Sequence, residues 1–203
     1  MSNTWADVKG KVSLWDNMYK SGHYKKTWSL EFPSPELIGV LMALDMSEGT
    51  QCLDVGCGTG ADLEYLVEKG FDVTGVDISS VAINLTQKRI DAKRLSARLL
   101  VGDILNMSLG DEKFDFITDR GCFHHIANEK RTIYADIIGD AIKAGGYLLL
   151  RGCRVTGSMW IPLVLDEINL LFPPKRFKNL GFDHFKYDAP KAIRGAITLI
   201  RRL

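Results

Sequence analysis

The sequence predicts an α/β protein built on a mostly parallel β-sheet. Between residues 51 and 150, short apolar runs typical of strands alternate with segments whose apolar residues recur at helical spacing. Three glycines at alternate positions, Gly56, Gly58 and Gly60, join the first strand to the helix that follows it. The run 147–150 is apolar throughout, as in a strand that is buried on both faces.

Length and composition are consistent with a single domain over residues 1–203. Of the 203 residues, 46% are hydrophobic and 25% are charged, which is ordinary for a soluble globular protein. The net charge of +1 lacks the strongly basic balance of most nucleic-acid-binding proteins. The sequence shows neither a signal peptide nor an apolar run near the ~18 residues of a membrane span. We therefore expect a cytoplasmic protein with no nucleic-acid or membrane partner.

The cysteine pattern predicts free thiols in a reducing compartment. The chain has four cysteines, with no C-x-x-C pair and no His/Cys spacing of a metal site. We therefore expect no metal cofactor. The four cysteines are Cys52, Cys57, Cys122 and Cys153.

Aromatic residues are concentrated in the first 30 residues, before any strand. Aromatic rings attract cationic ligand groups through their π faces and exclude water from a bound ligand. Trp15 and Trp28 are our candidates for such a contact within an aromatic cap over residues 1–30. The alternative is that these rings only anchor the N-terminal arm to the sheet. A helix is predicted for 33–46, with Ser34 as its N-cap, and we assign it no chemistry.

The stretch 51–68 reads as a strand, a tight glycine turn and a helix N-terminus, and it provides five candidate ligands. Such a turn lies outside the carboxyl end of a strand, where open α/β folds bind nucleotide-like cofactors. The acid before the glycines would repel a pyrophosphate but favours a cofactor with a sulfonium and an α-ammonium group. The candidate cofactor-binding residues here are Asp54, Gly56, Cys57, Gly58 and Gly60.

The octapeptide 53–60, Leu-Asp-Val-Gly-Cys-Gly-Thr-Gly, resembles motif I of the class I S-adenosylmethionine-dependent methyltransferases. That resemblance implies a Rossmann-like, seven-stranded, mostly parallel sheet in a three-layer sandwich that ends in an antiparallel hairpin. It also implies S-adenosylmethionine as the methyl donor and S-adenosylhomocysteine as the product. The N-terminal aromatic residues more closely resemble those of the thiopurine and halide/thiol methyltransferases, in which this segment folds over the cofactor.

A second strand at 71–77 ends in Asp77, about twenty residues beyond the glycine turn. An acid in this position can accept two charge-assisted hydrogen bonds from ribose hydroxyls. Asp77 is therefore our candidate ribose ligand, and the following Ile78 should contact the adenine. Ser79 is the predicted cap of a helix from Val81 to about Asp91.

The third and fourth strands, 97–101 and 113–119, also end near candidate ligands. The methyltransferase resemblance implies that Asp103 accepts from the adenine amine and that Ile104 supplies an apolar edge. It places Asp119 and Arg120 beside the methionine end of the cofactor. Arg120 could alternatively hold a carboxylate of the acceptor.

His124 and His125 follow the fourth strand, where the acceptor of the methyl group would enter. A histidine can act as general base when a hydroxyl acceptor starts protonated, whereas a thiol needs less help. His125 is the first candidate base and His124 the second. The alternative for each is a capping or loop-bracing role. The loop resembles the small-molecule branch and lacks the Asn/Asp-Pro-Pro-Tyr/Phe motif frequent in nucleic-acid and protein amine methyltransferases.

The remaining pattern predicts a helix over 128–144 that ends at two glycines, and a buried strand at 147–150. Beyond it, 155–180 reads as a partly helical cover near the acceptor pocket, with Trp160 and Phe172 as candidate wall residues. Apolar alternation at 181–187 and 196–202 predicts two last strands, which resemble the terminal hairpin of the class I sheet.

The sequence thus predicts an S-adenosylmethionine-dependent methyltransferase that acts on a small molecule, at sulfur or oxygen, as a monomer or homodimer. A non-catalytic S-adenosylmethionine-binding protein would carry the same cofactor motifs. A nicotinamide-dependent oxidoreductase would share the glycine turn and Asp77, but it leaves Asp54 and Asp103 unexplained. Neither the acceptor nor the oligomeric state follows from the sequence.

Overall fold

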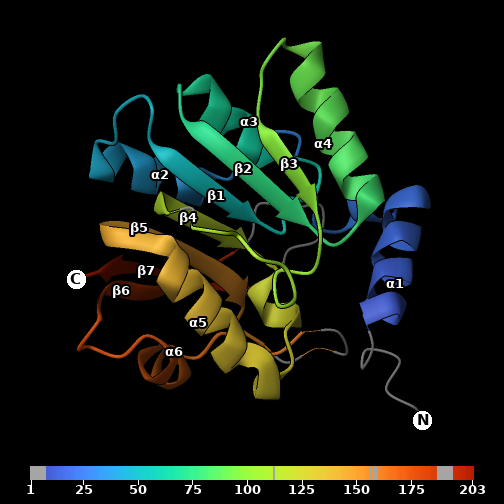
Figure 1. Cartoon of the computed structure of the whole chain (residues 1–203). Helices are drawn as coiled ribbons and strands as arrows, with labels where there is room; N and C mark the ends of the chain where they lie inside the picture. The colour runs from blue at the N-terminus through green and yellow to red at the C-terminus, as the bar shows by residue number, and fades with distance from the viewer. Residues whose placement is uncertain (1–7, 112, 156, 158–159, 187–193) are drawn as a thin grey trace.

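A seven-stranded sheet forms the centre of the molecule in the computed structural model, which describes residues 8–111, 113–155, 157, 160–186 and 194–203 (Figure 1). The strand order is β3-β2-β1-β4-β5-β7-β6. The first five strands pair in parallel, and β7 pairs antiparallel with both β5 and β6. The predicted fold class, including the C-terminal antiparallel pair, is confirmed. The strands are β1 Gln51–Val55, β2 Asp72–Asp77, β3 Arg98–Val101, β4 Phe114–Arg120, β5 Ile142–Cys153, β6 Phe177–Lys186 and β7 Arg194–Arg202.

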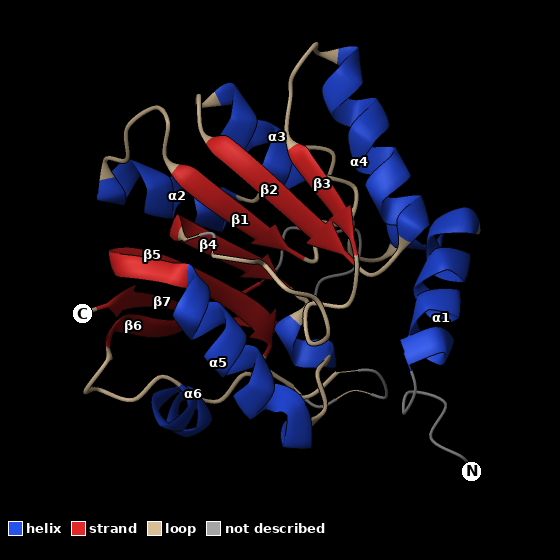
Figure 2. Ribbon diagram, in the orientation of Figure 1, coloured by secondary structure: helices blue, strands red, loops and turns tan. Residues whose placement is uncertain are grey.

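Helices cover both faces of this sheet and complete the three layers (Figure 2). The described α-helices are α1 Val8–Lys20, α2 Pro35–Leu44, α3 Ala61–Glu68, α4 Ser80–Ala92, α5 Arg131–Ala141 and α6 Leu165–Leu171. Short 3-10 helices are η1 His23–Lys26, η2 Phe123–His125 and η3 Asn128–Lys130.

The sheet has a separate apolar core on each face because successive side chains of a strand point to opposite sides. On β1, Cys52 packs with α2, α3 and α4, whereas Leu53 packs with α5 and α6. Both side chains are fully buried. Burial on both faces explains the unbroken apolar strands in the sequence.

The helix predicted for 128–144 is shorter than expected. Its first residues form η3, α5 ends at Ala141, and Ile142 already pairs with Phe114 as the first residue of β5. Gly145 has a φ of +81°, and the register between β4 and β5 shifts between Phe114 and Phe116. The two glycines therefore lie in an irregularity of the strand and do not end the helix, because β-pairing of Ile142 overrides its helical spacing.

The C-terminal segment also differs in detail from the prediction. Strand β6 begins at Phe177, earlier than the predicted position 181, and residue 187 lies outside the described residues. Phe172, a candidate wall residue, instead packs edge-to-face on Phe177 with ring centroids 5.3 Å apart, inside the α5/α6 core. Apolar packing of both rings, which are nearly fully buried, explains this placement.

None of the helices in the described part of the chain is long and apolar enough to cross a membrane. The described residues also contain no group of three or more His, Cys, Asp or Glu side chains placed to hold a metal ion.

Candidate active site

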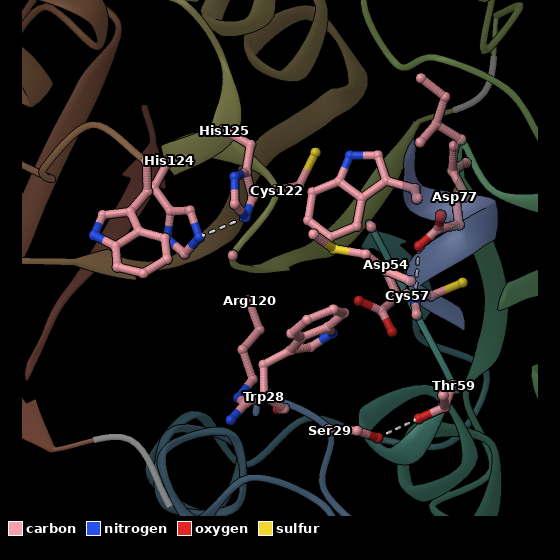
Figure 3. A pocket seen from close by; sticks show the side chains of 18 of the residues that line it. Trp28, Ser29, Asp54, Cys57, Thr59, Asp77, Arg120, Cys122, His124 and His125 are labelled. Carbon is pink, nitrogen blue, oxygen red and sulfur yellow. Dashed lines mark hydrogen bonds between the residues drawn. The ribbon is translucent and has the colours of Figure 1, made fainter. Parts of the chain in front are cut away.

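A cavity of about 810 Å³ opens at the carboxyl ends of β1, β2 and β4, within the size range of small-molecule sites. Figure 3 shows Asp54, Cys57 and Asp77 on one side of it, the two histidines on the other, and Arg120 with Trp28 between them. All predicted site residues except Gly60 and Asp119 line it, namely Trp15, Trp28, Asp54, Gly56, Cys57, Gly58, Asp77, Ile78, Asp103, Ile104, Arg120, His124 and His125.

The glycine turn presses close to the cavity because its residues carry no side chains. The backbone N–H groups of Gly56 and Cys57 donate to the carbonyl of Val76, at 2.8 and 3.0 Å. Gly56 has a φ of +69°, and a Cβ there would lie 2.8 Å from the Cβ of Cys122. At Gly58, with a φ of +59°, a Cβ would lie 3.1 Å from the Tyr19 hydroxyl. The turn thus forms a cradle that a larger residue would fill.

Gly60 supports this turn from outside the cavity wall. It is the left-handed N-cap of α3, with a φ of +79°, and a Cβ there would lie 2.6 Å from the Cγ2 of Thr86. The Thr86 hydroxyl donates to the Gly58 carbonyl at 2.9 Å. The structure therefore gives Gly60 a packing role between α3 and α4, and does not place it against a ligand.

Asp54 belongs to a buried polar cluster beneath the cavity. Its side chain is 3% exposed, and burial, reinforced by the nearby Asp62 and opposed by Arg151, raises its pKa well above the usual value. Arg151 is fully buried, pairs with Asp62 at 3.1 Å, and also donates to the Ser34 and Thr118 hydroxyls. Arg151 thus pairs with Asp62 and only influences the Asp54 charge from nearby, so a cationic ligand group at this end of the cavity would be favoured.

Ser34 contributes to the same cluster. It occupies the N-cap position of α2 as predicted, but its hydroxyl makes no capping bond and donates to Asp62 Oδ2 at 2.9 Å. The buried carboxylate is the stronger acceptor, and its demand for donors explains the difference.

Asp77 lies at the tip of β2 with its carboxylate held by the backbone. It accepts from the N–H groups of Gly58 and Ser79, both at 2.9 Å. Burial raises its pKa to about 6, although these two hydrogen bonds oppose the rise. Each carboxylate oxygen has lone-pair capacity beyond these bonds, so Asp77 can still accept from ligand hydroxyls. The predicted cap is also observed, since Ser79 Oγ accepts from the Ala82 N–H at 3.2 Å.

The Asp103 carboxylate is already engaged within its own turn. It accepts from the Leu105 N–H at 3.0 Å and from the Asn106 amide at 2.8 Å. These bonds hold the turn after β3 and leave Asp103, with the buried Ile104, at the cavity wall.

Aromatic rings of the N-terminal segment close the cavity from the side of α1. Trp15 and Trp28 meet edge-to-face, with centroids 5.7 Å apart, and Trp15 also meets the His125 ring at 4.8 Å. Asp16 accepts from the Ser79 hydroxyl at 2.6 Å and thereby ties α1 to the N-terminus of α4. Both predicted tryptophans therefore line the cavity.

Asp119 lies below the cavity wall and organises the loop after β4. It is fully buried and accepts from the N–H groups of Cys122 and Phe123 and from the Tyr134 hydroxyl. Burial raises its pKa to about 6 against these hydrogen bonds. The Asp119 carboxylate is thus directed to backbone and tyrosine donors and does not line the cavity, whereas the resemblance implied a place beside the cofactor. Arg120 does line the cavity and donates to the Trp28 carbonyl at 3.2 Å.

The two histidines form a hydrogen-bonded pair at the far end of the cavity. His124 Nδ1 accepts from the Cys153 N–H at 2.9 Å, and the two Nε2 atoms lie 3.0 Å apart. Burial lowers the His124 pKa well below the usual value, and a positive charge on His125 would lower it further. The lowered pKa favours the neutral ring, and its bond with the Cys153 N–H braces the loop against β5. Trp160 lies near it, with ring centroids 6.4 Å apart, and its buried indole N–H has no protein partner.

Sequence reasoning assigned no site role to several residues that support this cavity. Asp62, Arg151 and Tyr134 all act through contacts with distant parts of the chain. A buried-looking charged residue on an apolar strand, such as Arg151 after 147–150, is the one signal that could have indicated such a cluster.

The residues present fit S-adenosylmethionine. The cradle at the glycine turn admits a close ligand, Asp77 can accept from hydroxyls, and the shared charges around Asp54 favour an ammonium group. Trp15 and Trp28 offer π faces and edges to a sulfonium and shield it from water.

The family model of a methyltransferase domain matches residues 52–146. One similar protein is the EEF1A lysine methyltransferase 2 of Danio rerio, 28% identical over 80% of this chain and 76% of its own length. Another is the 2-heptyl-1-hydroxyquinolin-4(1H)-one methyltransferase of Mycobacteroides abscessus, 30% identical over 72% of this chain and 58% of its own length.

Among solved structures, the chain is similar to the 1,6-didemethyltoxoflavin-N1-methyltransferase of Burkholderia thailandensis, which was determined with 1,6-didemethyltoxoflavin and S-adenosylhomocysteine bound. The TM-score is 0.73 at 19% identity, over 95% of this chain and 87% of that one. A likeness at this identity shows the fold.

Proposed function

We propose that the protein is a methyltransferase of the class I fold that uses S-adenosylmethionine and transfers its methyl group to a small molecule, at sulfur or oxygen, as the match of residues 52–146 to a methyltransferase domain supports. One observation carries the proposal. A single cavity joins the acid-lined glycine turn to a second end lined by Trp160, His124 and His125. A cofactor at the first end therefore leaves room for an acceptor at the second.

The lining of the second end supports an apolar, ring-containing acceptor. Trp15, Ile126, Val155 and Trp160 line it together with the histidines. The hydroxyquinolone and didemethyltoxoflavin methyltransferases, by their names, act on small ring compounds. The finer part of the proposal is that the protein resembles the thiopurine and halide/thiol branch, in line with its N-terminal tryptophans.

S-adenosylmethionine supplies an electrophilic methyl group when bound. Asp77 would accept from the ribose hydroxyls, and Asp54 would favour the α-ammonium group. The acceptor is held by the aromatic end of the cavity, and alignment with the methyl group provides most of the acceleration. Trp15 and Trp28 exclude water from the reacting atoms.

The proposal includes the cellular setting. We place the protein in the cytoplasm as a monomer or homodimer with no nucleic-acid or membrane partner. The four cysteines, which are free thiols, are consistent with a reducing compartment.

A protein lysine acceptor is the second candidate, favoured by the similarity to the Danio rerio lysine methyltransferase. Its side chain would have to enter the cavity past α1. The transfer assay described below compares small molecules with lysine-containing proteins and can decide between the two acceptor classes.

Calorimetric titration with S-adenosylhomocysteine and, separately, NADH is the first test. Micromolar binding of S-adenosylhomocysteine alone is expected, whereas binding of NADH alone would overturn the cofactor. A transfer assay with labelled S-adenosylmethionine then compares thiols, halides and hydroxylated ring compounds with lysine-containing proteins. Labelling of small molecules supports the proposal. Labelling of protein alone would contradict it, and cofactor binding with no transfer to either class would indicate a non-catalytic binding protein.

A further inference from the structure

The hydrogen bonds around the histidine pair assign the position of each ring proton. The Cys153 N–H can only donate, so His124 Nδ1 carries a lone pair and His124 Nε2 carries the proton. His124 Nε2 then donates to His125 Nε2 across 3.0 Å. His125 Nε2 must therefore be an acceptor, and the proton of the neutral His125 ring lies on Nδ1.

This arrangement opposes protonation of either ring. A proton added to His125 Nε2 would point at the N–H of His124, and one added to His124 Nδ1 would point at the Cys153 N–H. Arg120 and Arg131 also act against a positive charge on His124. Each ring already uses a lone pair, so the pair is poorly arranged to take a proton from an acceptor.

The charged groups that face the pair come from several elements. Arg120 at the end of β4 lines the cavity, and Arg131 of α5 is paired with Glu167 of α6. Trp15 of α1 and Trp160 contribute uncharged rings. Among the described groups that face the pair, Arg120 and Arg131 thus oppose a positive charge on His124.

Cationic side chains also extend around this end of the cavity. Lys11 lies one helical turn before Trp15 on α1, which places it on the same helix face. Lys11 is near enough to Cys122 to oppose the rise in the pKa of that thiol, which burial and the nearby Asp119, Asp77 and Asp103 cause. Arg194 begins β7 next to Gly195, which pairs with Cys153. The aspartates that line the cavity come from β1, α3, the tip of β2 and the turn after β3.

We propose that the acceptor binds as a preformed anion, and that the His124–His125 pair stays neutral and positions it without acting as its base. This inference rests on the proposed function. The acceptor loses its proton to solvent before it binds. Its lone pair then forms the bond to the methyl carbon, the carbon–sulfur bond breaks with its electrons retained on sulfur, and no proton is transferred in that step.

The chemical class of the acceptor follows from this proposal. It is a ring compound with an acidic thiol, or with a phenol-like hydroxyl that ionises near or below neutral pH. A simple thiol has a reference pKa near 8.5, so an electron-poor ring would be needed to lower it. Cationic Lys11, Arg120 and Arg194 would attract such an anion.

The pH dependence of turnover tests the proposal. Acceptors with one ring skeleton but different acidities are compared from pH 5 to 9, and kcat/KM should rise through the pKa of each acceptor. One shared rise in kcat/KM, independent of acceptor acidity and lost in His125→Gln, would identify His125 as a base and overturn the proposal.

Lys11→Gln and Arg194→Gln should raise KM several-fold for anionic acceptors relative to neutral analogues. Lys9→Gln on the same helix, which does not line the cavity, is the matched control. Equal effects on both acceptor types would also contradict the proposal.

Nitrogen-15 NMR of labelled histidine tests the pair without turnover. In the protein without ligands, each ring should show one protonated and one unprotonated nitrogen from pH 5 to 8. Two protonated nitrogens on His125 near pH 6 would overturn the neutral pair. This measurement does not depend on finding an acceptor. A failure of the neutral-pair inference can therefore be distinguished from a failure of the proposed function.

Discussion

The Tyr134 hydroxyl donates to Asp119 Oδ2 across 2.7 Å, and both side chains are fully buried. Tyr134 lies on α5 and Asp119 on β4, so the bond joins a covering helix to the sheet. The same carboxylate accepts from Cys122 and Phe123, which precede the histidine pair. The position of the loop after β4, which carries the histidine pair, therefore depends on a helix behind it.

Tyr134→Phe should destabilise the protein by about 1–3 kcal/mol, because a buried carboxylate loses one donor. Urea unfolding followed by circular dichroism measures the change. Tyr147→Phe, in a half-buried ring outside this network, is the control and should stay within about 0.5 kcal/mol. Equal stability of wild type and Tyr134→Phe would show that the bond contributes nothing net.

Asp77→Ala should weaken S-adenosylhomocysteine binding by about 1.5–3 kcal/mol, the strength of hydrogen bonds to a charged group. Isothermal titration calorimetry gives the affinity. Asp72→Ala, at the exposed opposite end of β2, is the matched control and should bind like the wild type. Unchanged affinity of Asp77→Ala would remove Asp77 from the site.

Binding of S-adenosylhomocysteine should strengthen as the pH rises from 5 to 7. Burial raises the Asp77 pKa to about 6 in the ligand-free protein, so a growing fraction is protonated below that pH. Ribose hydroxyls donate to the ionised carboxylate. The affinity for S-adenosylhomocysteine should therefore reach its full value well above pH 6 and fall as the pH drops through 6. Titrations in Asp77→Asn should show a weaker dependence, and a flat wild-type curve would contradict this linkage.

Gly60→Ala should destabilise the protein more than Gly49→Ala. Both glycines have a φ near +78°, at +79° and +77°, so both variants strain the backbone equally, by about 1–2 kcal/mol. Only at Gly60 does the new Cβ lie 2.6 Å from Thr86, whereas nothing lies within 4 Å at Gly49. The difference between the two unfolding free energies isolates the contact with Thr86. Two equal losses would mean that α4 moves aside without cost.

Local sequence patterns predicted the parallel part of the fold well. The glycine turn and Asp77 carry their own signals, since backbone conformation and strand ends depend on adjacent residues. The start of β5 at Ile142 was missed because its apolar spacing continues that of α5. Only pairing with Phe114, distant in the sequence, makes it a strand.

The candidate site was predictable where the position of a residue at a strand end is enough to indicate its role. Asp119 shows the limit, because its three donors come from a loop and a distant helix, and they turn it from the cavity. The histidine pair shows another. The sequence placed both residues near the acceptor, but their ring protons depend on the Cys153 N–H of β5, which no local pattern reveals.

Strand order also constrains how the chain can assemble while it is being synthesised. In the sheet β7 lies between β5 and β6, although β6 precedes it in the chain. As the polypeptide leaves the ribosome, β6 emerges before the strand that joins it to the sheet, and must wait unpaired. The cofactor end, made by β1 and β2, can form early, whereas Arg194 reaches the acceptor end only with β7. A nascent chain stalled before β7 would therefore contain most of the cofactor-binding residues while its acceptor side was still incomplete.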